Sequence, residues 1–263
     1  MIRIFKLNLA IWLLAFSSLA QAAGGLKIIS YYEIILSEFF GLSGATMAEW
    51  MPVVGACLTF TLILLVGFSY RAALAKTQGS LVPDGGFSVK SVVEALLEFV
   101  IDLGTGVIGE KNVRPFLPLL TGLFCFIFIS NLTGLVPGFL PATDSLNTNL
   151  AMGITVFLVY NYAGIKEHGA AYIKQFLGPV LFLMPLMVVI EVIGHVARPI
   201  SLSLRLYGNI FGDHLVLSVF TSLTVLVFPA MFLFFGLMVA SLQSFVFTLL
   251  TSIYISMAMS HDH

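Results

Sequence analysis

Ionisable and amide side chains recur at helical spacing within one apolar stretch of the sequence. Glu191, Arg198 and Arg205 lie seven residues apart, which places them on one face of a continuous α-helix. His195 lies one turn from Glu191, and Asn209 lies one turn from Arg205. Ionisable groups inside a membrane segment usually mark an ion pathway or a proton relay. The spacing therefore indicates a helix that handles ions, provided that this stretch lies in a membrane.

Arg205 is the residue of this row that most needs an explanation. It lies in Leu202-Ser-Leu-Arg-Leu-Tyr-Gly-Asn209, with Ser201 one turn before it. A charge at bilayer depth costs on the order of 3 to 10 kcal/mol, and arginine stays charged because its ordinary pKa exceeds about 12. Glu191 and Asp213 do not stack directly above or below this cation. Its partner is therefore either a carboxylate of another chain or part of a saturated internal ion pair.

The composition places the stretch in a membrane. Of the 263 residues, 59% are hydrophobic and only 10% are charged, and the formal net charge is −1. Soluble domains carry roughly 25% charged residues. The two cysteines, Cys57 and Cys125, are spaced for neither a zinc site nor a redox pair. The sequence predicts an all-α polytopic membrane protein with no metal, no cofactor and no nucleic-acid partner.

The amino terminus has the pattern of a secretory signal. Residues 1–23 combine a basic start, a short apolar run and Ala20-Gln21-Ala22, which predicts a cleaved signal peptide, with an uncleaved first helix as the alternative. The remainder, 24–263, is expected to form a single membrane domain. Basic residues gather in two alternate loops, whereas the other loops contain only Lys27, so the segment before Met51 is predicted to lie outside. The basic residues of the two inner loops are Arg71, Lys76, Lys90, Lys111, Arg114, Lys166 and Lys174.

Hydropathy divides the first part of this domain into upright spans and one surface helix. The expected elements are an outside segment over 24–50, spans over 51–70, 116–136 and 150–165, and an amphipathic helix over 87–107. The amphipathic helix is expected to lie on the membrane or on a partner.

The apolar stretch 176–260 can be divided in two ways. One is three spans with 198–213 as an exposed loop, and the other is a hairpin over 176–190 followed by two long tilted helices, about 190–222 and 228–258. The seven-residue spacing favours the second division, because a loop has no reason to keep it. Pro199 is then expected to kink a continuous helix, with neighbouring groups satisfying the carbonyl that it frees.

Small residues recur at every fourth position of the last helix. The stripe consists of Gly236, Ala240, Ser244, Thr248, Ser252 and Ser256. Small residues at this spacing let helix backbones approach closely in lipid, which suits a partner that crosses at an angle. Gln243 stands beside the stripe as the only strongly polar amide of that helix.

Two other classes of membrane protein also place polar groups in helices. A haem or quinone redox protein could use His195 and His214 as axial ligands, but on one helix these residues lie about 28 Å apart, and only different helices would bring them to one haem. An autonomous secondary transporter usually has two matching halves, and the sequence shows no internal repeat.

Three motifs, in their order along the chain, resemble those of subunit a of the rotary F-type ATP synthase. One is the stretch from Glu191 to His214, which contains Arg198-Pro199 and Leu202-Ser-Leu-Arg205-Leu-Tyr-Gly-Asn209. The others are Asn131-Leu-Thr-Gly-Leu-Val-Pro137-Gly and Leu242-Gln243-Ser-Phe-Val-Phe-Thr. The resemblance covers about residues 30–260, with a motif in each of three helices.

The resemblance implies a stator subunit that is not catalytic alone. Its partners would be a ring of c subunits, peripheral-stalk b subunits and the rest of the complex. A bacterial plasma membrane fits the predicted signal peptide best, with an organelle of bacterial origin as the alternative, and the division into two long helices returns the carboxyl terminus to the cytoplasm. Two offset proton half-channels would end at Arg205, which would deprotonate a ring carboxylate and block a proton leak. The tilted helices would face the ring.

The resemblance also assigns residues to the two parts of this machinery. The proton path would use Glu191, Asn209, His214 and Gln243, with Asp213, Ser201 and His195 as further candidates. Gly236, Ala240, Ser244 and Thr248 would pack against the ring. The family often carries a polar group at position 236 as a partner for position 214, and here Asp213 is expected to replace it.

Overall fold

The computed structural model describes eight stretches of the chain, and these contain helices and turns but no strand. The described residues are 31–32, 37–38, 45–76, 88–136, 138–169, 172, 184–223 and 227–260. The predicted signal peptide, most of the outside segment and residues 176–183 lie outside these ranges. Within them, the prediction of an all-α protein is confirmed.

Six α-helices and one 3-10 turn make up the described part of the chain. They are α3 (Ala45–Lys76), α4 (Val89–Ile108), α5 (Leu117–Gly134), η1 (Ala142–Asp144), α6 (Leu146–His168), α8 (Met184–Leu223) and α9 (Val227–Met259). Four of them contain a segment long and apolar enough to cross a membrane, namely Glu49–Ala75, Leu117–Gly134, Leu186–Asp213 and Phe234–Met259. α6 covers the span expected over 150–165, but it is not among these four, so that crossing stays a prediction.

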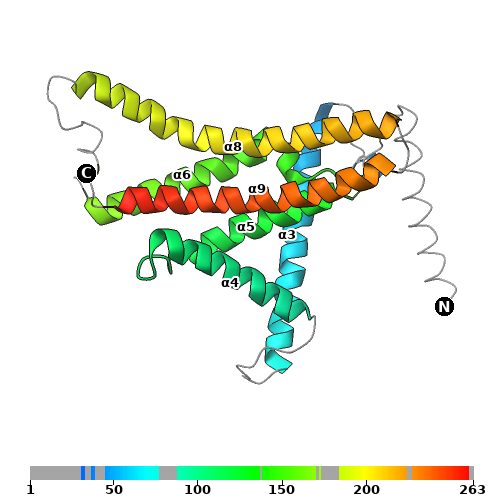
Figure 1. Ribbon diagram of the computed structural model, residues 1–263, viewed down its shortest axis with the longest axis horizontal. Coiled ribbons are helices and arrows are strands. Elements are labelled where there is room, and N and C mark those ends of the chain that lie inside the picture. The colour runs from blue at the N-terminus through cyan, green and yellow to red at the C-terminus, as the bar shows by residue number, and fades with distance from the viewer. Residues whose placement is uncertain are drawn as a thin grey trace.

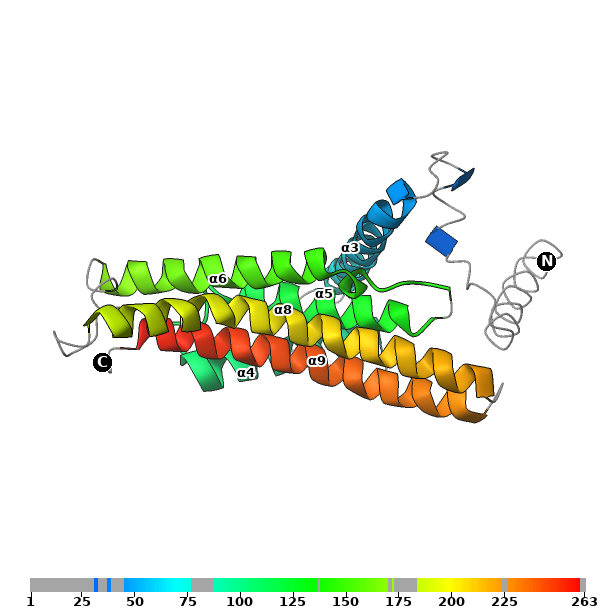
Figure 2. The same cartoon turned by 90° about the horizontal axis from the view of Figure 1, so that it is seen from above.

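The long helices fall into two directions. α8 and α9 lie side by side and antiparallel, and α5 and α6 pack along them, whereas α3 crosses this group steeply (Figures 1 and 2). The expectation of three upright spans beside two tilted helices does not match this arrangement, because α5 and α6 share the direction of α8 and α9. They follow that direction because they bury side chains along the length of the α8–α9 pair.

α8 is a single continuous helix through Pro199. The interpretation of 198–213 as an exposed loop is therefore wrong, and the division into two long helices is confirmed. The helix begins at Met184 rather than near 190, so the second half of the hairpin expected over 176–190 belongs to α8. Its 40 residues extend about 60 Å, roughly twice the thickness of a bilayer's hydrocarbon core.

α4 confirms the helix expected over 87–107. Val100 is fully buried against Leu120 and Phe124 of α5, whereas Val89 and Val92 are more than half exposed. The ring of Phe99 also lies 5.8 Å from that of Phe124. α4 thus packs on the helix group through one face, and its position on a membrane surface stays a prediction.

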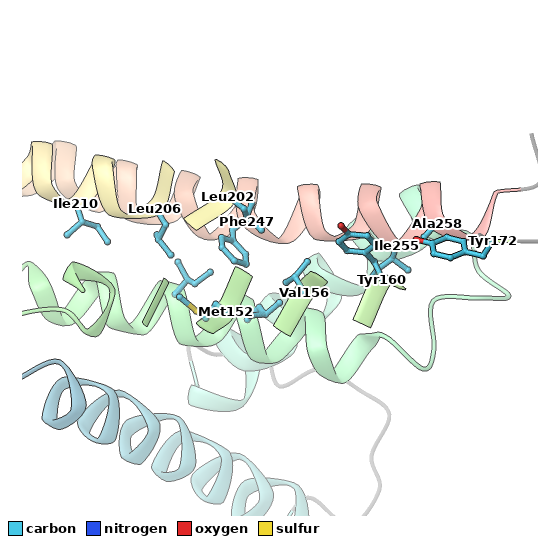
Figure 3. Close-up of a cluster of buried hydrophobic side chains, with 12 residues drawn as sticks. Met152, Val156, Tyr160, Tyr172, Leu202, Leu206, Ile210, Phe247, Ile255 and Ala258 are labelled. Carbon is cyan, nitrogen blue, oxygen red and sulfur yellow. The ribbon is translucent and has the colours of Figure 1, made fainter. Parts of the chain in front are cut away.

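The main core lies between α6, α8 and α9 and fixes the rotation of α8. Leu202, Leu206 and Ile210 of α8 are 2%, 0% and 7% exposed, and they point toward Val156 and its neighbours on α6 (Figure 3). Because buried residues recur at every fourth position, one face of α8 packs in the core. The opposite face, which carries Leu204 at 50% exposure, points away from the chain.

Candidate functional site

Arg205 lies on the exposed face of α8, inside the candidate span Leu186–Asp213. Leu206, the next residue, is fully buried, which directs the arginine away from the core. Among the residues that the structure describes, none forms a hydrogen bond or an ion pair with Arg205. The alternative of a saturated internal ion pair therefore finds no partner in the described part of the chain. Ser201, one turn earlier, is exposed on the same face.

One turn beyond Arg205, α8 is joined to α9 through two amide side chains. Asn209 Nδ2 donates a hydrogen bond to Gln243 Oε1 at 2.6 Å. Gln243 is 5% exposed, whereas Asn209 is exposed. The structure thus brings together two residues that the sequence analysis placed on the same path, although 34 positions separate them.

An open cavity of about 160 Å³ adjoins this amide pair. Its polar lining comes from Asn131 of α5, Asn209 and Asp213 of α8, and Gln243 of α9. The cavity is roomy enough for several water molecules, and the polar groups supply the partners that such water needs. Sequence reasoning quoted Asn131 only as part of a motif. We refer to this feature below as the open cavity.

Gly236 contributes space to the open cavity rather than a functional group. A Cβ atom at this position would lie 2.6 Å from Leu135 Cδ2, so any side chain would require Leu135 to move. Asp213, whose side chain is exposed, is the acidic residue of the lining. His214 follows it in α8, and its side chain lies outside the described part of the structure.

A second polar group lies on the other side of Arg205 along α8 and is closed by aromatic rings. His195 is 8% exposed, and its Nε2 is hydrogen-bonded to Asn161 Oδ1 at 2.8 Å. The rings of Phe157 and Tyr160 meet the imidazole edge to face, with centroids 5.5 and 5.1 Å away.

The remaining members of this group come from three segments. Tyr172 donates a hydrogen bond to Asn161 Oδ1 at 3.2 Å, and the Arg198 guanidinium lies 5.8 Å from the centre of the Tyr254 ring, a cation–π distance. We refer to His195, Tyr160, Asn161, Tyr172, Arg198 and Tyr254 as the His195 cluster. Glu191, which is half-buried, lies one turn before His195 on α8.

The sequence analysis missed Asn161 and Tyr160. Asn161 was visible as a single amide in the apolar run over 150–165, which is a signal for a buried polar contact. Its partner could not be named, because 34 residues separate it from His195.

The small-residue stripe of α9 lies inside the chain. Ala240, Ser244 and Thr248 are 4%, 0% and 0% exposed, and Gly236 is half-buried against Leu135. The hydroxyls of Ser244 and Thr248 bond back to carbonyls of their own helix, at 3.1 and 2.9 Å. The expectation that these residues pack against a ring is therefore wrong. The stripe lets the chain's own helices approach α9.

The continuity of α8 excludes a haem held by His195 and His214. His195 and His214 both belong to this one continuous helix, about 28 Å apart along its axis. A single haem cannot span that distance.

A model of the family described as "ATP synthase A chain" matches residues 33–256. The chain belongs to this family. The match includes both polar regions of α8 and the exposed arginine between them.

Relatives in the family are similar over most of their length. ATP synthase subunit a of Bdellovibrio bacteriovorus is 44% identical over 199 residues, which are 75% of this chain and 86% of the relative. ATP synthase subunit a 2 of Syntrophotalea carbinolica is 40% identical over 233 residues, 88% of this chain and 96% of the relative. ATP synthase subunit a of Aliarcobacter butzleri is 38% identical over 229 residues, 87% of this chain and 97% of the relative.

Membership in the ATP synthase A chain family agrees with the helical architecture. The described part of the chain contains four helices able to cross a membrane, which fits a multi-pass component of ATP synthesis and hydrogen-ion transport. The resemblance inferred from the three motifs is thereby confirmed.

Proposed function

We propose that this chain is the proton-conducting stator of a rotary ATP synthase, against which a ring of c subunits turns. The observation that carries the proposal is Arg205, a permanent cation in an apolar helix that faces outward and has no partner in the described part of the chain. An exposed intramembrane cation requires a carboxylate from outside the chain. A ring whose subunits each carry one carboxyl group meets this requirement repeatedly.

Arg205 acts on that carboxyl group by electrostatics. When a protonated ring carboxyl approaches, the guanidinium stabilises its ionised form, because a neighbouring positive charge lowers a carboxyl pKa by roughly 1–3. The O–H bond breaks, the proton passes to a polar group on the exit side, and the carboxylate pairs with Arg205. The pair separates when the next proton arrives from the entry side. Because arginine does not lose its own proton, it blocks direct flow between the two sides.

The open cavity supplies the entry side in this proposal. Asn209, Gln243 and Asp213 line a space that can hold water, and His214 follows directly on α8. Histidine is the side chain whose ordinary pKa lies nearest to neutral pH, so His214 is the proposed relay from Asp213 toward the ring.

The His195 cluster, with Glu191 and Ser201, supplies the opposite side. The last turn of α6 carries Lys166, and the positive-inside rule places such residues in the cytoplasm. The neighbouring start of α8 is therefore cytoplasmic, and the open cavity faces outside. In this orientation the carboxyl terminus is also cytoplasmic, in a bacterial plasma membrane, and the peripheral-stalk b subunits complete the stator.

A cysteine cross-link to the ring tests the partner and the rotation of α8 together. After replacement of Cys57 and Cys125, Leu204→Cys is paired with a cysteine beside the ring carboxylate, and Leu206→Cys is the matched control. Leu204 is 50% exposed and Leu206 is fully buried, so only the first is expected to form a disulfide with the ring. Cross-linking through Leu206, or through neither residue in an assembled complex, contradicts the proposal.

A further inference from the structure

A hydroxyl from α6 lies at the point where Pro199 interrupts the hydrogen bonding of α8. Proline has no N–H, so the carbonyl of His195, four residues earlier, lacks its helical donor. Tyr160 donates its hydroxyl to this carbonyl at 3.3 Å. The expectation that a neighbouring group satisfies the freed carbonyl is thus met by a residue of a different helix.

One turn later, a second hydroxyl joins the same two helices. Ser203 donates to the carbonyl of Pro199 at 2.7 Å and to the carbonyl of Asn149 on α6 at 2.9 Å. Ser203 and Asn149 are both fully buried. Because one hydroxyl hydrogen serves both carbonyls, the contact requires α6 and α8 to keep a fixed separation.

Gly153 makes this separation possible. A Cβ atom at position 153 would lie 2.4 Å from Ser203 Oγ and 2.8 Å from the carbonyl oxygen of Pro199. The second contact is with backbone and cannot be relieved by a rotamer change. Any side chain at position 153 must therefore push α8 away from α6 at the proline.

We propose that the α6 face formed by Asn149, Gly153 and Tyr160 is a positioning clamp for Arg205. Gly153 is a positioning residue, since it acts through the packing of α6 on α8 at Pro199 rather than by touching a proton or the ring. Tyr160 belongs to the His195 cluster as well, and its part in the clamp is the hydrogen bond to the carbonyl of His195. Ser203 precedes Arg205 by two residues on α8, so a displacement at the clamp moves the guanidinium directly. The inference rests on the proposed role of Arg205 and adds the device that sets its reach.

The physical need for a clamp follows from the proline. A helix that lacks one hydrogen bond bends more easily at that point, and the missing bond, between positions 195 and 199, lies six to ten residues before Arg205. Misplacing a reacting group by about 1 Å can reduce a rate by about 10²-fold. A cation that must meet each passing carboxylate at the same place gains from a rigid support.

Gly153→Ala tests the clamp, with Gly122→Ala as its matched control. A Cβ atom at Gly122 meets nothing within 4 Å, so the control adds a methyl group to a membrane helix without moving another helix. The measurement is ATP-driven proton pumping by inverted membrane vesicles, divided by the amount of assembled complex. Gly153→Ala is expected to lower this rate about 10- to 100-fold, whereas Gly122→Ala should leave it unchanged.

Second-site rescue separates positioning from assembly. Ser203→Ala removes the atom nearest to the added methyl group, so the double variant Gly153→Ala/Ser203→Ala is expected to pump about threefold faster than Gly153→Ala alone. If Gly153 had a role in assembly alone, Gly153→Ala would lower the amount of complex but not the rate per complex. Ser203→Ala would then have no lost rate to restore.

Tyr160→Phe and its control Tyr162→Phe keep the test decisive if Gly153→Ala does not assemble. Tyr162 lies on the same helix and is 66% exposed. Tyr160→Phe is expected to slow pumping per complex about two- to fivefold, the effect of one lost hydrogen bond. The clamp is overturned if Gly153→Ala pumps at the same rate per complex as Gly122→Ala. Where only Tyr160→Phe assembles, a rate equal to that of Tyr162→Phe overturns it. Arg205→Ala in the same series distinguishes the failures, because normal pumping in that variant defeats the proposed function itself.

Discussion

The open cavity and the His195 cluster both take polar residues from α8, yet the surroundings of those residues differ. Asn209 and Asp213 are exposed beside a space of about 160 Å³, which glycine at position 236 helps to keep empty. His195 is 8% exposed and lies between aromatic rings, with an amide as its hydrogen-bond partner. Neighbouring side chains therefore decide whether a polar group on α8 meets water or only protein.

Under the proposed function, this difference predicts two ways of moving protons on the two sides of Arg205. In the open cavity, water can carry a proton between fixed polar groups, so the size of the space should matter most. In the His195 cluster, the protons must follow protein groups, so the chemistry of individual side chains should matter most. Substitutions can test each half of this statement separately.

The largest effect is expected where the two regions meet. Arg205→Lys keeps the charge but places a group there that can lose its proton, and Arg205→Ala removes the charge. Both are expected to reduce ATP synthesis by about 10²-fold or more. Arg205→Ala loses the electrostatic stabilisation of the carboxylate, and Arg205→Lys allows the added amine to release its proton and so opens a leak. The measurement is ATP synthesis per assembled complex. Coupled synthesis at the normal rate in either variant would rule out the proposed role of Arg205.

The next largest effect should come from filling the open cavity. Gly236→Leu places a side chain where a Cβ atom already lies 2.6 Å from Leu135, and we expect proton flux to fall about tenfold as water is displaced. Leu135→Ala in the same chain should restore part of the flux by returning space. An unchanged flux in Gly236→Leu would show that protons do not pass through this cavity.

A smaller effect is expected on the closed side. Glu191→Gln keeps the shape of the side chain and removes its ability to exchange a proton, so transport should slow about three- to tenfold without stopping. Exposed Glu167 of α6 provides the control, and Glu167→Gln should leave the rate unchanged. Proton pumping measured against pH in both variants tests this expectation, and identical profiles would remove Glu191 from the path.

The smallest effect is expected at Tyr172, at the edge of the His195 cluster. Burial raises the pKa of the Tyr172 hydroxyl above its ordinary value, so it stays protonated and donates to Asn161 throughout the physiological range. Tyr172→Phe should therefore change pumping by less than about twofold, with no new dependence on pH up to 9. A marked loss of activity would mean that this hydroxyl takes part in proton transfer rather than in packing.

The sequence predicted the course of α8 because periodicity is local information. Glu191, Arg198 and Arg205 repeat every seven residues, and that repeat distinguishes a helix from a loop without reference to any other segment. The outward direction of Arg205 is consistent with the same reasoning, since apolar residues at every fourth position occupy the other face.

Other features depend on contacts between distant segments, and these could not be predicted. The stripe from Gly236 to Thr248 indicated a close approach, but spacing does not say which helix approaches, and the structure buries it within the chain. The pairing of His195 with Asn161 and of His195's carbonyl with Tyr160 depends on the register of α6 against α8. Register follows from packing of whole faces, which one sequence does not reveal.

The length of α8 has a mechanical consequence. A helix of about 60 Å is roughly twice as long as a hydrocarbon layer is thick, and if it lies at a slant, positions along it differ sideways as well as in depth. Under the proposed function, the open cavity and the His195 cluster then serve the ring at different angles around its circumference. An upright helix would stack them at one angle and give the ring no preferred sense of turning. Under the proposed function, a slanted α8 would convert a drop in proton potential into a direction of rotation.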